Sequence, residues 1–197
     1  MIKNQLHAEK TEAFPNTQSM GRMKKRIALL DKQEATILKE IKGVVQTLPT
    51  LKQHVDILST IPGVGMLTAA TVLAETNGFD LIRNKKQLTS YTGLDVKEKQ
   101  SGTSVKGKPT ISKRGNKHLR KALHLPALAA IRHEQHYKNI FVRLVSKHGI
   151  KMKAAVAVQR KILELMYVLF KTEKPYDRNY NPQILTKQIR VTENQLP

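Results

Sequence analysis

Residues 51–76, LKQHVDILSTIPGVGMLTAATVLAET, contain the pattern that decides the fold. We read one helix over roughly Leu51–Thr60 and a second over Met66–Glu75, because the second carries small and apolar residues on one face. That face consists of Leu67, Ala70, Thr71 and Ala74. Between the helices, the residues Ile61-Pro62-Gly63-Val64-Gly65 form a tight turn. Two short helices joined by a Pro-Gly-x-Gly turn predict a helix-hairpin-helix.

The two glycines of this turn point to a binding role. Each stands where a backbone turns sharply and comes close to another group. The N–H groups from Gly65 to Thr68 would point outward at the start of the second helix, with the helix dipole behind them, which is the arrangement of a phosphate site. The candidate contact residues are Gly63, Val64, Gly65 and Thr68. From these residues alone, an ordinary tight turn between packed helices explains the pattern equally well.

On the N-terminal side, residues 20–50 have apolar positions spaced by three and four. This heptad seam consists of Met20, Met23, Ile27, Leu30, Ile37, Ile41, Val44 and Leu48. Glu34 interrupts the seam, and Pro49 interrupts the helix. Two interpretations stay open: an amphipathic helix packed on its own domain, or a coiled coil that joins copies of the chain into a homo-oligomer. Residues 1–19 are polar and aperiodic, so we expect a linker or tail there.

On the C-terminal side, the sequence predicts further helices. Asp80 can cap a helix from about Leu81 to Tyr91, the Gly-rich stretch Asp95–Gly115 reads as a loop, and helices resume at Asn116 and near Met152. The last helix carries a broad apolar stripe of Ala154, Ala155, Val158, Ile162, Leu165, Met166 and Leu169. We therefore predict an all-α fold. In it, the long heptad helix precedes a domain over residues 51–172, made of the helix-hairpin-helix and a small helical bundle, and residues 173–197 form a flexible tail.

The charge balance indicates a polyanionic partner. The chain has 35 Lys and Arg against 15 Asp and Glu, a formal net charge of +20, and such a field destabilises a compact chain unless a polyanion shares it. A membrane is the weakest candidate, because the longest apolar stretch, Ile162–Phe170, is far shorter than the roughly 20 residues of a span. No signal peptide is visible, and the lack of cysteine excludes disulfides and cysteine-rich zinc sites. We expect a cytoplasmic protein that binds DNA or RNA and no membrane.

A cluster of cations at a predicted helix start is the second candidate site. Its members are Lys113, Arg114, Lys117, Arg120 and Lys121, with His124 one turn further on. From Lys117 onward they fall at i, i+3, i+4 and i+7, which places them on one face of the helix. A run of charges is often only a solvated face. Acidic residues are nearly absent between Lys99 and Arg132, however, so the unpaired cations repel one another and favour a polyanion.

Hydroxyl groups gather in the loop QSGTSVKGK, residues 100–108. Serine is a weak nucleophile that needs a base, or cations that stabilise the attacked group, and the lysines of this loop could stabilise a pentacovalent phosphate. A mobile polar loop explains the same residues, so composition and spacing alone establish no chemistry here. The sequence also shows no clustered Asp and Glu of the kind that two-metal phosphoryl transfer needs, and we predict no metal site in this chain.

Several of these blocks together resemble one known family. The turn at Ile61–Gly65 followed by Thr-Ala-Ala-Thr, the stretch LTSYTGL at Leu88–Leu94, SGTS at Ser101–Ser104 and ISKRGNKHLR at Ile111–Arg120 are similar to successive blocks of the DEDD transposases. These are insertion-element recombinases related to the Piv DNA invertase. The similarity extends from about Met20 to Phe170, and the heptad helix matches the coiled coil that leads into the family's C-terminal module.

The resemblance implies a mechanism in which a serine of the C-terminal module attacks a DNA phosphodiester and becomes covalently linked to the strand. Ser101 matches that position best, and Ser104 is the alternative because the loop differs from the commoner Ser-Ser-Gly-Gly form. Family members also carry an N-terminal RuvC-like domain with four acidic metal ligands, and they use a structured guide RNA to choose target and donor DNA. This chain begins where that domain's last segment would end. We therefore expect Mg²⁺ only together with such a domain.

These features predict the C-terminal part of a DNA-binding transposase that acts in DNA transposition and recombination, associated with the nucleoid of a prokaryotic cell. The chain would then be an enzyme only as part of a complete protein. The alternative is a non-catalytic DNA- or RNA-binding helix-hairpin-helix module. A third hypothesis is a basic assembly protein that oligomerises through its heptad helix.

Overall fold

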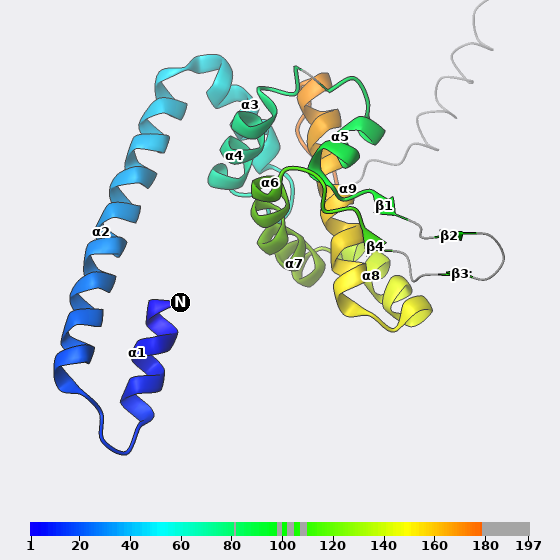
Figure 1. Ribbon diagram of the computed structural model, residues 1–197. Coiled ribbons are helices and arrows are strands. Elements are labelled where there is room, and N and C mark those ends of the chain that lie inside the picture. Colours follow the sequence, from blue (N-terminus) through cyan, green and yellow to red (C-terminus); the bar gives the residue numbers. More distant parts are fainter. Residues whose placement is uncertain (81, 98–99, 102–104, 107–109, 179–197) are drawn as a thin grey trace, which may run out of the picture. The chain divides into compact units, whose positions relative to one another are not determined.

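The computed structural model describes residues 1–80, 82–97, 100–101, 105–106 and 110–178, and most of these residues are helical (Figure 1). The strands among them are two residues long each. The predicted all-α class is therefore confirmed. The chain divides into two compact units, Met1–Lys52 and Gln53–Pro197.

The first unit is a helical hairpin of α1, Ile2–Thr11, and α2, Thr17–Thr47 (Figure 1). The Asn16 side chain caps α2 by accepting a hydrogen bond from the Ser19 amide. Lys3 of α1 and Asp31 of α2 form an ion pair, with 3.1 Å between Nζ and Oδ1. The expectation of a linker or tail over residues 1–19 is therefore wrong. The half-buried pair Ile2 and Leu6, spaced i and i+4, gives α1 an apolar face that its polar composition conceals.

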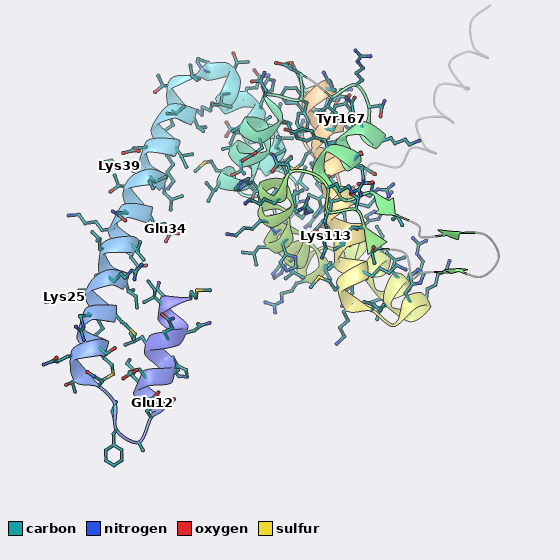
Figure 2. The ribbon with its side chains drawn as sticks, in the orientation of Figure 1. Glu12, Lys25, Glu34, Lys39, Lys113 and Tyr167 are labelled. Carbon is teal, nitrogen blue, oxygen red and sulfur yellow. The ribbon has the colours of Figure 1, made fainter. Side chains whose placement is uncertain are left out.

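Helix α2 carries the predicted heptad seam in two parts. Met20, Met23 and Ile27 are half-buried in the part of α2 that lies alongside α1 (Figure 1). Further along, the seam is 45–56% exposed at Leu30, Ile37, Val44 and Leu48. Glu34, which interrupts the seam, and Lys39 project from this second part (Figure 2). The second part is an apolar surface of the kind that a partner helix covers, and pairing with a second copy stays a prediction.

The second unit is a bundle of helices with a small antiparallel extension. Pro49 stands at the first helical position of α3, where its fixed φ fits and its missing N–H costs nothing. The predicted interruption at Pro49 is confirmed, since α2 ends at Thr47. The helices and strands are α3 (Pro49–Ser59), α4 (Met66–Thr76), α5 (Lys85–Thr92), β1 (Val96–Lys97), β2 (Gln100–Ser101), β3 (Val105–Lys106), β4 (Thr110–Ile111), α6 (Lys117–Ala122), α7 (His124–His133), α8 (Gln135–His148) and α9 (Lys151–Thr172).

Helix α9 forms the centre of the core, and α5, α7 and α8 pack against it (Figure 1). The predicted apolar stripe is confirmed, because all its members are buried except Leu165, which is half-buried. Phe79 is fully buried against the C-terminal half of α9. Its ring lies edge-on to Tyr167, with 5.5 Å between centroids, and 5.1 Å from the ring of Phe170.

Two helix predictions need correction. Helix α4 buries Ala69, Val72, Leu73 and Thr76 and leaves Leu67 45% exposed, so the face predicted from Leu67, Ala70, Thr71 and Ala74 is wrong. Helix α5 begins at Lys85, where the Asn84 side chain accepts from the Gln87 amide, and not near Leu81 behind Asp80. The reason is a left-handed turn between α4 and α5, in which Asn77, Gly78 and Phe79 all have positive φ.

The stretch Asp95–Gly115, expected as a loop, contains antiparallel pairs. Val96 pairs with Ile111 in β1 and β4, and Gln100 pairs with Lys106 in β2 and β3. These pairs are too short to show an alternating pattern in the sequence.

The first residues of the predicted flexible tail at 173–197 contact the helical bundle. The Tyr176 N–H donates to Thr60 Oγ1 at 2.8 Å, and Arg178 forms an ion pair of 2.9 Å with Glu134. Residues 179–197 lie outside the described part of the chain. None of the helices that the structure describes is long and apolar enough to cross a membrane.

Candidate nucleic-acid interface

The turn between α3 and α4 is anchored in the core by its apolar residues. Ile61 and Val64 are 1% and 5% exposed, and the Val64 N–H donates to the Ile61 carbonyl at 2.9 Å, which closes the turn. Val64 therefore offers neither its side chain nor its N–H to a ligand. Val64 thus has a structural role in the turn, and the nucleic-acid contact predicted for it stays a prediction.

Gly63 is required by packing inside the protein. Its φ is +86°, and a Cβ placed on it would lie 3.0 Å from the Ala130 nitrogen and would collide with the Pro126 carbonyl oxygen. Both atoms belong to the backbone of α7. The glycine thus lets the turn approach α7 closely, and this contact accounts for Gly63 without any phosphate.

Gly65 is different, because its surroundings are open. Its φ is −98°, and a Cβ placed on it would meet no heavy atom of the described residues within 4 Å. Gly65 is also the N-cap of α4, and among the described residues no side chain caps this helix. The first N–H groups of α4, at Met66, Leu67 and half-buried Thr68, therefore keep their capacity to donate to an anion.

Two further glycines let the end of α5 cross the segment before α6. Gly93 has φ +67°, and a Cβ on it would lie 3.0 Å from the Arg114 nitrogen. A Cβ on Gly115 would collide with the Tyr91 carbonyl oxygen. The crossing is tied by backbone hydrogen bonds from the Lys113 N–H to the Gly93 oxygen at 3.1 Å and from the Asn116 N–H to the Tyr91 oxygen at 2.9 Å. Sequence reasoning missed this crossing, although one glycine stands in each of the two blocks that form it.

Asn116 organises the start of α6. Its Oδ1 accepts from the His118 and Leu119 amides, which satisfies the first turn of the helix. Its Nδ2 donates to Glu75 Oε2 at 2.6 Å, which ties α6 to the C-terminal end of α4. The base of the cation cluster is therefore fixed to two other helices, α4 and α5.

Arg120 belongs to this framework and not to the exposed cation face. Its Nη1 donates to the Thr92 carbonyl at 2.7 Å and to the Gly115 carbonyl at 3.0 Å. The guanidinium is thereby directed inward onto the α5–α6 crossing. The sequence prediction grouped Arg120 with the nucleic-acid contacts, and these two hydrogen bonds make its structural role primary.

The other members of the cluster face solvent. They are Lys113, Arg114, Lys117 and Lys121. None of them forms an ion pair within the described residues. Two acidic side chains that bind this segment have neutral partners, since Glu75 accepts from Asn116 and Asp95 accepts from the Ser112 hydroxyl. Uncompensated charge therefore remains on one side of the α6 start, where Lys113 lies (Figure 2).

The structure places the two candidate anion sites at opposite ends of α4. Gly65 and Thr68 lie at its N-terminal end, and Glu75, which holds Asn116, lies at its C-terminal end. At 1.5 Å per residue the two ends are about 15 Å apart. Along the axis of duplex DNA this length corresponds to about four to five steps of 3.4 Å.

The first candidate nucleophile, Ser101, has its backbone in the antiparallel extension. The backbone of Ser101 pairs with Val105 at the β2–β3 end, and the pairing of β1 with β4 connects this extension to the segment before α6. The side chain of Ser101, and the whole of Ser104, lie outside the described part of the chain. Within the described residues, no group of three or more His, Cys, Asp or Glu side chains could hold a metal ion. The described residues thus do not fit a metal site.

Comparison with known proteins places these features in a family context. Residues 55–141 match the family described as Transposase IS116/IS110/IS902. The chain is 29% identical over 140 residues to the pilin gene-inverting protein of Moraxella bovis, covering 71% of this chain and 44% of that protein. It is 30% identical over 156 residues to the transposase for insertion sequence element IS1111A of Coxiella burnetii, covering 75% of this chain and 41% of that protein. The chain thus spans less than half the length of these relatives.

Proposed function

Because residues 55–141 carry a domain of the IS116/IS110/IS902 transposase family, we propose that this chain is the DNA-binding C-terminal part of a transposase that acts in DNA transposition and recombination. One observation supports the DNA-binding role above the others. Four exposed cations, Lys113, Arg114, Lys117 and Lys121, gather at one helix start without an ion-pair partner in the described residues. A polyanion would neutralise the mutual repulsion of these charges.

The mode of binding that fits this arrangement is contact with the phosphate backbone. Lysine and arginine side chains neutralise phosphates and fix the register of a protein on the duplex, but they carry no sequence code by themselves. The open N–H groups at Gly65–Thr68 supply a second contact about 15 Å away along α4. This surface would therefore hold DNA of any sequence.

One substitution tests this binding mode. Gly65→Val would block the approach of a phosphate to the α4 amides without a clash inside the protein, because a Cβ at Gly65 has open space. We expect a weaker affinity for duplex DNA, and the loss should be equal for duplexes of unrelated sequence, as measured by fluorescence anisotropy. A loss confined to one sequence, or no loss at all, would contradict the phosphate contact.

We further propose that Ser101 is the nucleophile. In that step, the Ser101 oxygen forms a bond to a DNA phosphorus, and the bond from that phosphorus to a deoxyribose oxygen breaks. The serine proton passes to a base, and the leaving deoxyribose oxygen gains a proton, so that charge balances. The support is the family resemblance and the position of Ser101 in an extension that is connected through β1 and β4 to the cation cluster. Lys99, Lys106 and Lys108, which lie near Ser101 in the sequence, would stabilise the charge on the phosphate.

A covalent adduct assay tests the nucleophile. The protein used must also contain a RuvC-like domain, in the same polypeptide or supplied separately, together with Mg²⁺, because the described residues of this chain do not fit a metal site. Under these conditions Ser101→Ala should abolish the covalent protein–DNA adduct while duplex affinity stays nearly unchanged, since one hydroxyl contributes little to binding. Ser104→Ala is the matched control. An adduct that survives Ser101→Ala and disappears with Ser104→Ala would reassign the nucleophile, and one that survives both would contradict the serine mechanism.

The same proposal extends to partners and location. A structured guide RNA would select the DNA, the exposed part of the α2 seam would join two copies of the chain, and affinity for DNA would keep the protein on the prokaryotic nucleoid. A non-catalytic DNA- or RNA-binding module is the alternative function. It predicts unchanged duplex binding but no adduct in the assay above, even with the RuvC-like domain and Mg²⁺ present.

A further inference from the structure

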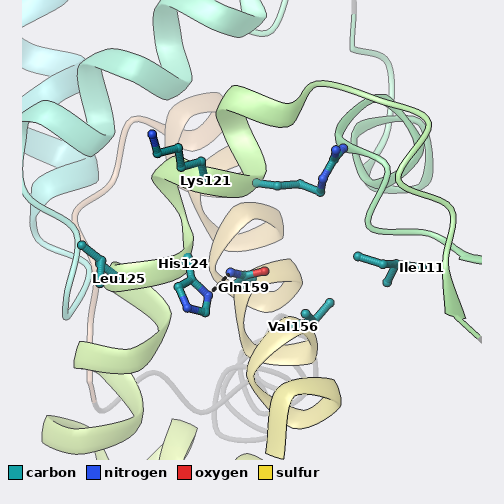
Figure 3. Close-up of a pocket in the computed structure, with 7 residues that line it drawn as sticks. Ile111, Lys121, His124, Leu125, Val156 and Gln159 are labelled. Atoms are coloured by element: carbon teal, nitrogen blue, oxygen red, sulfur yellow. Dashed lines mark hydrogen bonds between the residues drawn. The ribbon is translucent and has the colours of Figure 1, made fainter. Parts of the chain in front are cut away.

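An open pocket lies between the cation cluster and the central helix (Figure 3). It has a volume of about 500 Å³, which is within the range of ligand pockets. Residues of β4, α6, α7 and α9 line it. They are Ile111, Arg120, Lys121, His124, Leu125, Val156 and Gln159.

The floor of the pocket contains a buried polar pair. Gln159 is a polar residue within the apolar stripe of α9, and it is only 4% exposed. A buried amide is costly unless it is hydrogen-bonded, and Gln159 Nε2 lies 3.0 Å from His124 Nδ1 (Figure 3). Because an amide nitrogen only donates, His124 Nδ1 accepts, and in this arrangement the imidazole carries its proton on Nε2.

This pair leaves one donor and one acceptor for a ligand. The donor is the Nε2–H of His124. The acceptor is Oε1 of Gln159, which points away from His124 (Figure 3) and which forms no hydrogen bond with the described residues. Each of these two groups can hydrogen-bond one polar atom of a base, since bases that leave a duplex are recognised by hydrogen bonds to their edges.

The walls and the rim of the pocket complete a site for a nucleotide. Ile111, Leu125 and Val156 supply apolar surface for a flat ring. Lys121, which is exposed and forms no ion pair in the described part of the chain, stands at the rim on the α6 side (Figure 3). The apolar walls can therefore contact a base inside the pocket, and Lys121 can bind its phosphate at the rim.

We propose that this pocket holds one unstacked nucleotide of a bound DNA strand, with its base against His124 and Gln159 and its phosphate on Lys121. The inference rests on the proposed DNA-binding function and adds to it a place for a nucleotide that has left the duplex. Ile111 ends the strand that closes the extension bearing Ser101. A nucleotide held beside Ile111 would keep the strand near the proposed nucleophile.

Fluorescence of 2-aminopurine tests this inference. The probe is a duplex with a single unpaired 2-aminopurine nucleotide at its 3′ end, and the reference is the same label inside a fully paired duplex. Neighbouring bases quench 2-aminopurine, so its withdrawal from them into the pocket should raise its emission several-fold. We expect this rise on saturation of the overhang probe and not of the paired reference.

Two variants link the signal to the pocket. Val156→Phe would narrow it with a larger side chain, and Leu125→Glu would place a negative charge at its rim, where Leu125 is 72% exposed and the fold tolerates a polar residue. Both should reduce the fluorescence rise. Val156→Phe should leave the affinity for the paired duplex unchanged, whereas Leu125→Glu should weaken it no more than Lys121→Ala does, because its charge would lie near Lys121. Val142→Phe is the matched control, because Val142 is 53% exposed on α8 and does not line the pocket.

The outcomes separate the two proposals. Binding of both DNAs without a rise in wild-type fluorescence would overturn the nucleotide pocket and leave DNA binding intact. An undiminished rise in both Val156→Phe and Leu125→Glu would overturn it as well. A chain that binds neither DNA would contradict the proposed function itself.

Discussion

The two glycines of the α3–α4 turn should respond in opposite ways to the same substitution. Gly63 has φ +86° and packs its α-carbon onto the backbone of α7, whereas Gly65 has φ −98° and open space around it. Replacing each by alanine adds one methyl group in both cases. Because the surroundings of the two glycines differ, the two substitutions should change the free energy of unfolding by different amounts.

The magnitude for Gly63→Ala follows from two costs. A left-handed backbone costs a residue with a Cβ about 1–2 kcal/mol, and crowding against a packed backbone costs about 1–3 kcal/mol. Together they predict a loss of roughly 2–5 kcal/mol, or a fall in Tm of roughly 5–20 °C for a chain of this length. Gly65→Ala should instead change the unfolding free energy by less than about 1 kcal/mol, with a gain favoured because alanine restricts the unfolded chain.

Thermal unfolding followed by circular dichroism measures both changes, with duplex DNA absent. A Tm for Gly63→Ala equal to that of the wild type would refute the packing role of Gly63 and return this residue to the phosphate interpretation. A Gly65→Ala variant that loses as much stability as Gly63→Ala would refute the assignment of Gly65 to an open surface.

Three further predictions concern framework, pH and assembly. Arg120→Ala should lower the free energy of unfolding by about 1.5–3 kcal/mol, because the Thr92 and Gly115 carbonyls lose a charged donor. As the control, Lys117→Ala removes an exposed side chain and should change this free energy by less than about 0.5 kcal/mol in the same melts. Equal effects of the two substitutions would contradict the inward role of Arg120. Burial raises the pKa of Tyr137 above its ordinary value, with smaller contributions from Tyr176 and Glu134. The contribution of Tyr137 to the free energy of unfolding should therefore be fully present below about pH 10 and decrease as the pH rises further. Urea titrations of Tyr137→Phe should show a weaker decrease than those of the wild type, and an identical decrease would contradict the assignment. Ile37→Glu with Val44→Glu should leave a monomer of 22.3 kDa in light scattering if the α2 seam joins two wild-type copies, and a monomeric wild type would contradict that pairing.

The features that the sequence predicted well are those set by local periodicity. The stripe of α9 could be read directly because its apolar residues recur at helical spacing and all face one core. Helix α1 was missed because only the half-buried Ile2 and Leu6 form its apolar face, in a segment that is otherwise mostly polar. The short strands around Ser101 were missed because pairs of two residues have no period.

The roles of single site residues depended on partners far away in the sequence. The sequence around Gly63 fits a phosphate-binding turn and an ordinary tight turn equally well. Its role depends on its contact with α7, which lies more than sixty residues later in the sequence. Arg120 has the spacing of the exposed cation face, but the Thr92 carbonyl draws its guanidinium inward. His124 and Gln159 are 35 positions apart and lie on two different helices, so no local sequence motif predicts their contact.

The salt dependence of DNA binding tests the central claim most directly. If Lys113, Arg114, Lys117 and Lys121 each neutralise a phosphate, the slope of log K against log salt should flatten by about 0.9 for each alanine substitution on duplex DNA. Lys3→Ala is the control, because Lys3 is already paired with Asp31, and its slope should equal that of the wild type. The account predicts a slope reduced by about 3.6 in the variant that carries all four substitutions, whereas a slope equal to the wild-type value in that variant, with its fold intact, would contradict it.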